Sequence, residues 1–174
     1  MRLIILGAGG YGQTVADIAS QTGKYEEILF LDDNQNQASL YPIAGPCSDY
    51  RLYKTDETCM YPAFGNNESI LGWINRFINE RISIPTIIHL LAYVSPTATI
   101  AEGCVVMPHA VVNTNCKLEK ACIMNVAAIL DHGCILEEGC HLAPGAIVKA
   151  ENRLPRCTKV DSGEVIGNRT FSFC

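Results

Sequence analysis

The sequence lacks several features that would place it in a specialised class. Aromatic residues make up only 7% of the 174 residues, and no run reaches the roughly 18 apolar residues of a membrane-spanning helix. Acidic residues outnumber basic ones, the formal net charge is −5, and no basic cluster suggests nucleic-acid binding. An apolar start is interrupted from Gly7 to Gly12, unlike a secretory signal. We therefore expect a cytoplasmic protein with neither nucleic acid nor membrane as partner.

Cysteine is plentiful, but no CxxC pair occurs among the nine cysteines, so neither a zinc knuckle nor a thioredoxin-type site is indicated. Five of them share one phase of a six-residue period: Cys104, Cys116, Cys122, Cys134 and Cys140. We interpret these as small buried side chains in a reducing compartment. We assign no catalytic role to the other four cysteines, Cys47, Cys59, Cys157 and Cys174.

The first ninety residues alternate strand and helix patterns, which predicts a Rossmann-like α/β domain over residues 1–90. Expected elements are strands at 3–6, 28–31, 61–64 and 84–88 and helices at 13–21 and 68–79. Asn67 is the expected N-cap of the second helix. Residues 36–58 are rich in turn formers, and we expect loops there with at most one short strand.

A six-residue repeat begins at Val94 and predicts a different architecture for residues 91–174. Every sixth residue is aliphatic or Met: Val94, Ile100, Val106, Val112, Leu118, Met124, Leu130, Leu136, Leu142, Val148, Leu154 and Val160. The residue four later is small, and the residue three later is often Gly or Asn, which tolerate left-handed backbone. This pattern predicts a left-handed parallel β-helix of hexapeptide repeats, with a little over three coils. Its flat, partly apolar faces predict a homotrimer.

A glycine-rich loop follows the first strand. Gly7-Ala8-Gly9-Gly10-Tyr11-Gly12 matches GxGxxG, and Asp32 and Asp33 follow the second strand about twenty residues later. Such a loop brings backbone N–H groups to a pyrophosphate at a helix N-terminus. We predict substrate binding by Gly9, Gly10, Tyr11, Asp32 and Asp33. NAD is the generic ligand, but a nucleotide-linked substrate suits this incomplete dinucleotide fold better; a tight turn without a ligand is the alternative.

Three histidines in the repeat region are candidate functional residues: His109, His132 and His141. His132 lies two residues after the inward Leu130, a phase that points away from the interior. A neutral imidazole is a suitable base for an incoming amine or hydroxyl near pH 7. A solvated or interface histidine, or a zinc site formed by the three, are the alternatives, although no ligand spacing requires a metal.

Several motifs together resemble a known family. The glycine-rich βαβ start, Gly65-Asn66-Asn67, the IPTIIH run at 84–89, AYVSPTA at 92–98, DHGC at 131–134 and HLAPGA at 141–146 are similar to the NeuD/PglD-type sugar acyltransferases. The resemblance covers nearly the whole chain. It implies a nucleotide-linked sugar on the N-terminal domain and acetyl-CoA between neighbouring β-helices of a trimer, with no metal.

The resemblance also implies residue roles. His132 corresponds to the general base of the family. Asn125 corresponds to the family's asparagine seven residues before the base, and His141 would lie near the thioester of acetyl-CoA. We expect backbone N–H groups near Gly145 to stabilise the oxyanion. Three departures stand out: Gly133 occupies the position of an acidic residue that orients the base, Tyr11 replaces a histidine in the glycine-rich loop, and the segment 153–174 replaces a longer C-terminal ending.

The sequence thus predicts transfer of an acetyl group from acetyl-CoA to a nucleotide-linked amino sugar or a sugar hydroxyl. Asp131 or a neighbouring subunit could supply the carboxylate absent at Gly133. The first alternative is a non-catalytic nucleotide- or CoA-binding module with a degraded site. The others are a nicotinamide-dependent enzyme, suggested by the GxGxxG loop, and a zinc enzyme of the carbonic anhydrase type.

Overall fold

The structure, a computed structural model, describes residues 1–171, so the expectation for Cys174 lies outside the described residues. The chain forms two compact units, Met1–Pro85 and Thr86–Cys174. The division falls after Pro85, not after residue 90, because Ile87–Ile88 pairs with Val105–Val106 of the second unit. None of the helices within residues 1–171 is long and apolar enough to cross a membrane.

The first unit contains a three-stranded parallel sheet in the order β2-β1-β3. The central strand β1 (Arg2–Leu6) pairs with β2 (Glu27–Leu31) on one side and β3 (Thr58–Pro62) on the other. Residues Leu3 to Leu6 are fully buried, which explains their continuous apolar run. The strand order reverses at β1, and ligands of such sheets bind at the carboxyl ends of the strands where this reversal occurs.

Both helices of this unit begin at other residues than the sequence pattern predicted. Helix α1 (Gly10–Gln21) starts earlier than residue 13, within the glycine-rich loop. Helix α2 (Asn67–Asn79) is capped by Asn66, not Asn67, because the Asn66 side chain accepts the N–H of Ser69 at 3.0 Å. The segment expected as loop contains a 3₁₀ helix, η1 (Cys47–Tyr53), whose Tyr50 packs edge-on against Trp73.

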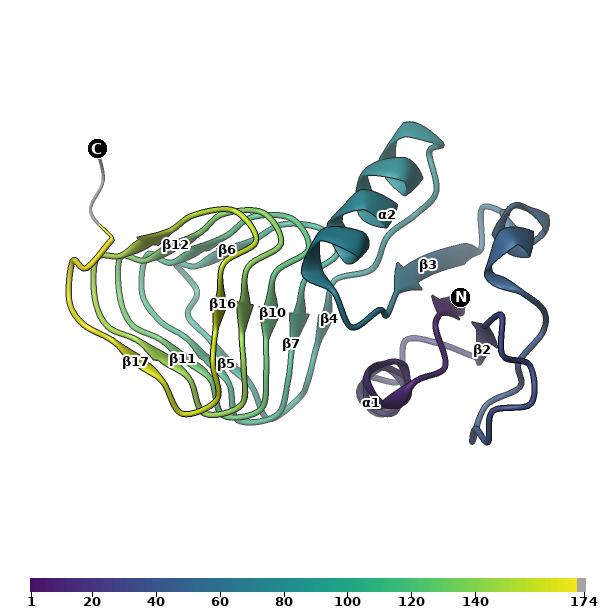
Figure 1. Cartoon of the computed structure of the whole chain (residues 1–174), viewed down its shortest axis with the longest axis horizontal. Coiled ribbons are helices and arrows are strands. Elements are labelled where there is room, and N and C mark those ends of the chain that lie inside the picture. Colours follow the sequence, from purple (N-terminus) through teal and green to yellow (C-terminus); the bar gives the residue numbers. More distant parts are fainter. Residues whose placement is uncertain (172–174) are drawn as a thin grey trace. The chain divides into compact units, whose positions relative to one another are not determined.

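The second unit is a left-handed β-helix of two-residue strands, stacked from β4 to β17 in Figure 1. Within residues 1–171 its strands form three parallel sheets, each named here by its first strand. The β4 sheet contains β4 (Ile87–Ile88), β7 (Val105–Val106), β10 (Ile123–Met124), β13 (His141–Leu142) and β16 (Lys159–Val160). The β5 sheet contains β5 (Tyr93–Val94), β8 (Val111–Val112), β11 (Ile129–Leu130), β14 (Ile147–Val148) and β17 (Val165–Ile166). The β6 sheet contains β6 (Thr99–Ile100), β9 (Lys117–Leu118), β12 (Ile135–Leu136) and β15 (Arg153–Leu154).

The β-helix has more coils than expected. Strand β4 lies before the first hexad at Val94, and β17 lies after the last hexad at Val160. Each residue also pairs with the residue one full coil, or eighteen positions, away, as Ile129 does with Val111 and Ile147. Residues far apart in sequence therefore form columns along the β-helix.

The interior is filled by the aliphatic residues of the repeat, as the period predicts. Leu118, Leu130 and Leu136 are completely buried, and burying each such side chain contributes about 1.5–3 kcal/mol. The five in-phase cysteines are also buried and free. Their thiols donate to backbone carbonyls of the next coil, as Cys134 Sγ does to Lys149 O at 3.1 Å. They are interior packing residues.

The corners of the β-helix share one backbone conformation. Every sixth residue from Gly103 to Arg169 has a φ between 52° and 72°. Glycine suits this left-handed region, but His109, Ala121, Ala127, Glu151, Cys157 and Arg169 adopt it as well. The left-handed corners predicted from Gly and Asn are therefore confirmed, and they extend to other residue types.

Candidate active site

His132 lies at the corner between the β5 sheet and the β6 sheet, directly after β11 and before Gly133. We call this the His132 corner. The imidazole is 58% exposed and faces outward, at the second position after the inward Leu130. The side chain is thus accessible to a ligand.

Asp131 orients this imidazole. Its Oδ1 lies 3.0 Å from His132 Nδ1 and also accepts the backbone N–H of His132 at 2.7 Å and the side-chain amide of Asn113 at 3.2 Å. These bonds, first the backbone N–H of His132 and then its side chain, lower the pKa of Asp131, so its carboxylate is ionised at neutral pH. An ionised acceptor at Nδ1 assigns the proton of neutral His132 to that nitrogen and leaves the Nε2 lone pair available.

A pocket of about 260 Å³ opens beside His132. It is lined by His132, Ala150, Glu151, Asn168 and Arg169. Four polar residues near His132 were not predicted from the sequence: Glu151, Asn168, Arg169 and Asn113. The signal that could have located them is the eighteen-residue coil. Asn113 lies one coil before Asp131, Asn168 lies two coils after His132, and Glu151 and Arg169 lie one and two coils after Gly133.

Asn125 and His141 meet at a different corner, between the β4 sheet and the β5 sheet, which we call the Asn125 corner. Asn125 Nδ2 lies 3.2 Å from His141 Nε2. Burial first, and then the nearby Lys159 ammonium, lower the pKa of His141 to about 4. His141 is therefore neutral near pH 7 and can form a hydrogen bond with Asn125 in this state.

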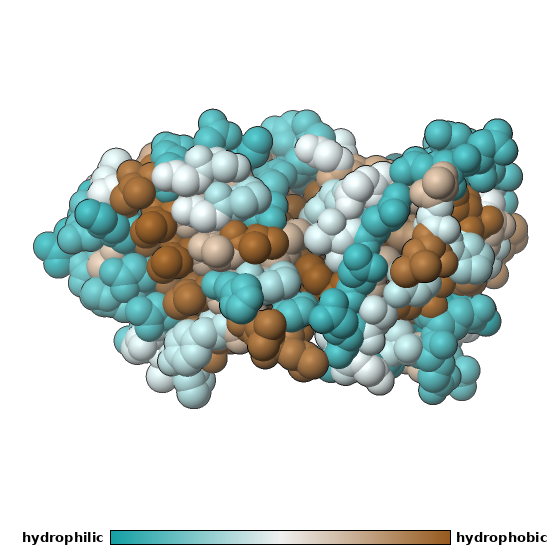
Figure 2. Space-filling view, turned by 90° about the horizontal axis from the view of Figure 1, so that it is seen from below, coloured by the Kyte–Doolittle hydropathy of each residue, from teal (hydrophilic) through white to brown (hydrophobic). Residues whose placement is uncertain are grey.

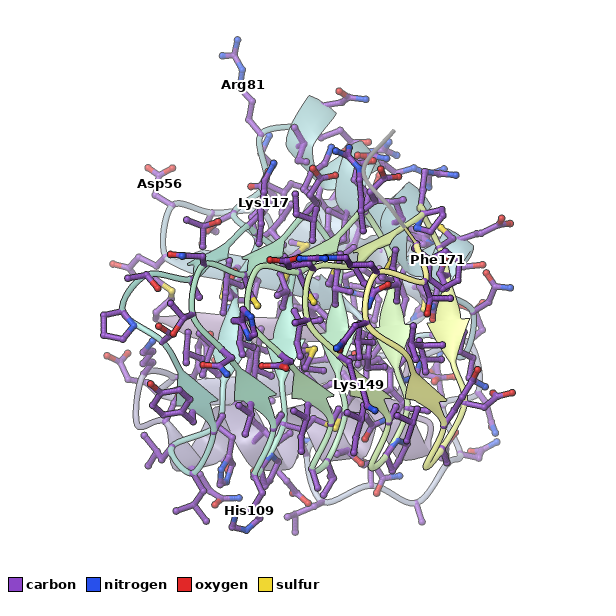
Figure 3. The ribbon with its side chains drawn as sticks, turned by 90° about the vertical axis from the view of Figure 1, so that its left-hand side faces the viewer. Asp56, Arg81, His109, Lys117, Lys149 and Phe171 are labelled. Carbon is purple, nitrogen blue, oxygen red and sulfur yellow. The ribbon has the colours of Figure 1, made fainter. Side chains whose placement is uncertain are left out.

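Within one chain, strand β11 separates these two groups. Asn125 precedes β11 and His132 follows it, so the three predicted residues do not form one cluster in a single β-helix. His109 lies at the Asn125 corner and projects away from the coil (Figure 3). Within residues 1–171, no group of three or more His, Cys, Asp or Glu side chains is arranged to hold a metal ion.

Gly145 also lies at the Asn125 corner, with a φ of 69°. Its N–H donates to Val126 O at 2.9 Å. That N–H is already engaged within the coil, so an oxyanion at this corner needs a different donor. What Gly145 offers a ligand is space, because an added Cβ would meet only Gly163 N, at 4.0 Å.

The glycine-rich loop of the first unit joins β1 to α1. Gly9 is the N-cap of α1, no side chain caps the helix, and no acidic residue occupies its first turn. Cβ atoms placed on Gly9 or Gly10 would meet nothing within 4 Å, so both face open space. Tyr11 is tied to β3, since its hydroxyl lies 2.7 Å from that of Tyr61. The exposed helix N-terminus therefore favours an anionic ligand.

The two aspartates after β2 hold the loops around this site. Asp32 Oδ2 accepts the N–H of Ala8 at 2.6 Å, and its Oδ1 accepts the N–H of Asn34 at 2.7 Å. Asp33 Oδ1 accepts the N–H of Cys47 at 3.0 Å. Burial, with Asp33 and Asp32 nearby, raises the pKa of the Cys47 thiol to about 11, so it is protonated and unsuited to nucleophilic attack.

Comparison with known proteins gives a consistent result. The family model for the PglD N-terminal domain matches residues 2–77. The acetyltransferase domain of PglB from Neisseria gonorrhoeae, in complex with acetyl coenzyme A, is 33% identical; the match covers 94% of this chain and 80% of that one, with a TM-score of 0.91.

Two more distant structures share the fold. PerB from Caulobacter crescentus, in complex with CoA and GDP-perosamine, is 23% identical over 97% of this chain and 89% of that chain, with a TM-score of 0.76. WeeI from Acinetobacter baumannii is 20% identical over 96% and 81%, with a TM-score of 0.85. With its Rossmann-like first unit and hexapeptide β-helix, the chain belongs to the NeuD/PglD-type family of sugar acetyltransferases and is an acyltransferase.

Proposed function

We propose that the protein transfers an acetyl group from acetyl-CoA to the amine of a nucleotide-linked amino sugar or to a sugar hydroxyl. The observation that carries this proposal is the outward-facing Asp131–His132 pair, with an Nδ1–Oδ1 distance of 3.0 Å, beside an open pocket. Acetyl coenzyme A in the PglB domain and GDP-perosamine in PerB support the two substrate classes.

His132 would act as the general base. Acetyl-CoA supplies the activated acetyl group, and His132 Nε2 would take the proton of the acceptor N–H or O–H as the acceptor bonds to the thioester carbonyl carbon. Asp131 would stabilise the resulting imidazolium through Nδ1–H. His132 would then return the proton to the departing CoA sulfur. Asn125 and His141 would contact the thioester end from the other corner.

The first unit would bind the nucleotide part of the acceptor. Gly9 and Gly10 leave the N-terminus of α1 open to a diphosphate, whose charge the helix dipole favours. Asp32 and Asp33 keep the surrounding loops in place and retain lone pairs for a hydroxyl or base N–H. Tyr11, fixed by Tyr61, would form one wall of the sugar site.

A homotrimer would complete the acetyl-transfer site. The outward residues of the β5 sheet form an apolar column: Tyr93, Val111, Ile129, Ile147 and Val165. Tyr93 is 54% exposed and Val165 51% exposed, and Figure 2 shows a row of hydrophobic residues along the β-helix. An exposed apolar column of this length favours burial against another copy.

The same sheet is bordered by both half-sites. The Asn125 corner lies along one edge of the β5 sheet and the His132 corner along the other. In a closed ring of three β-helices, the His132 corner of one chain can approach the Asn125 corner of the next. This arrangement explains why residues separated by β11 in one chain would act on one thioester.

The experiment is a thiol-release assay with acetyl-CoA and a panel of UDP- and GDP-linked amino sugars and free sugars, with products identified by mass spectrometry. We expect turnover of at least one amino or hydroxyl acceptor. His132→Ala should reduce kcat by at least about 100-fold with the oligomer intact. Undiminished turnover in that variant would refute the role of His132, and ligand binding without any product would favour the non-catalytic module.

A further inference from the structure

Glu151 lies one coil beyond Gly133 in the same corner column. Both residues have left-handed backbone, with φ values of 58° and 68°. The Glu151 N–H donates to His132 O at 3.1 Å, and a Cβ built on Gly133 would lie 3.4 Å from Glu151 Cγ. Since Gly133 has no side chain, the Glu151 side chain takes the space beside the His132 turn.

Arg169 fixes the direction of this carboxylate. It occupies the next corner of the column, with a φ of 52°, and its guanidinium forms an ion pair with Glu151. Arg169 lowers the pKa of Glu151, so the carboxylate is ionised at neutral pH. Both residues line the 260 Å³ pocket together with His132.

We propose that Glu151, held by Arg169, is a positioning residue that favours the protonated imidazole formed when His132 accepts a proton. The importance of this effect for catalysis rests on the proposed function, whereas the electrostatic coupling does not. The charged groups around His132 are Asp131 at Nδ1 and Glu151 and Arg169 in the lining of the pocket, and Lys149 follows Asp131 one coil on. Glu151 and Arg169 carry opposite charges in the lining of the pocket, so removing one charge or the other should affect His132 in opposite directions.

The coupling should be electrostatic and sensitive to salt. Glu151 would act through the open pocket, whereas Asp131 contacts the imidazole directly, with its Oδ1 3.0 Å from Nδ1. Exposed charges interact weakly, and about 1 M salt reduces their range to roughly 3 Å. A purely structural role at the corner would show no such dependence on salt.

The test compares pH profiles of kcat/KM for the protein and its variants. Glu151→Gln should move the acid limb to lower pH by about 0.2–0.7 unit at low salt, because loss of the negative charge disfavours the imidazolium. Arg169→Gln should move it to higher pH. Both shifts should shrink in about 1 M NaCl.

Glu137→Gln is the matched control. Glu137 is paired with Arg153 at 2.6 Å, an equivalent glutamate–arginine pair that lies outside the His132 pocket. It should leave the acid limb in place. An equal shift in Glu137→Gln, or no shift in either Glu151→Gln or Arg169→Gln, would overturn the proposal.

A second measurement needs no substrate. The ring resonances of the four histidines can be assigned by substitution, and the titration midpoint of His132 followed by NMR. Glu151→Gln should lower this midpoint and Arg169→Gln should raise it; unchanged midpoints would overturn the coupling. A shifted midpoint in a protein that acetylates no acceptor would support the coupling while the proposed function failed.

Discussion

Asp131 Oδ1 lies 3.0 Å from Nδ1 of the adjacent His132, and the same oxygen accepts the His132 backbone N–H at 2.7 Å. Neighbouring residues can form this pair because the chain turns sharply at the corner after β11. A carboxylate thus precedes the imidazole, where the family resemblance places one after it, at Gly133. The missing acidic residue does not leave His132 without an orienting partner.

Asp131→Asn should reduce kcat/KM by at least about 10-fold, because an amide can turn its NH₂ toward Nδ1 and favour the wrong tautomer of His132. The KM for acetyl-CoA should change little. Steady-state kinetics check this, with Asp161→Asn as control, since Asp161 pairs with Lys159 at 3.5 Å away from the pocket. Equal kcat/KM for Asp131→Asn and the parent would remove Asp131 from the mechanism.

Ile147→Glu should dissociate the proposed trimer, because it places a charge in the middle of the apolar column of the β5 sheet. Light scattering coupled to size-exclusion chromatography measures the mass. Ile135→Glu is the matched control on the β6 sheet, where Lys117 and Arg153 flank the site and can pair with the new carboxylate. A parent protein that is monomeric, or Ile147→Glu that stays trimeric, would contradict this interface.

Stability should decrease as the pH falls from about 6.5 to about 4. The folded protein lowers the pKa of His141 to about 4, whereas an unfolded histidine titrates near 6.5. The unfolded state therefore binds the extra proton in this window, and the free energy of unfolding decreases on acidification. Allowing for partial exposure of the ring, the loss is on the order of 2 kcal/mol.

Urea unfolding at several pH values tests this effect. His141→Gln should flatten the pH dependence between pH 6.5 and 4. The exposed His109→Asn, at a corner where Asn suits the left-handed backbone, should leave it unchanged. A slope that is the same in His141→Gln and the parent would show that other groups cause the acid sensitivity.

Gly12→Ala should destabilise the first unit strongly, by about 3 kcal/mol or more, because an added Cβ would lie 1.9 Å from Gly7 O. Gly10→Ala is the control, since its Cβ would meet nothing within 4 Å. Calorimetry should show an earlier transition for Gly12→Ala only. Equal stability of the two variants would mean that the loop moves freely to accept the methyl group.

In the first unit, local sequence patterns predicted the βαβ start but not the details of capping and loop contacts. Its βαβ start was predictable because buried parallel strands leave continuous apolar runs and the GxGxxG loop requires glycine at Gly7 and Gly12. The N-cap at Asn66 was not, because Asn66 and Asn67 are equally suitable and only the hydrogen bond to Ser69 distinguishes them. The engagement of Asp32 with Ala8 likewise depends on how two loops meet.

The sequence by itself determined the β-helix, its buried aliphatic interior and the outward direction of His132, because a six-residue period is repeated along the chain and each repeat faces the same environment. Only the tertiary structure decided which side chains surround His132. Glu151 and Arg169 line its pocket from other coils, and Asn113 donates to its partner Asp131 from the preceding coil. A pairing across eighteen residues is one of many that the sequence allows until the coils are stacked.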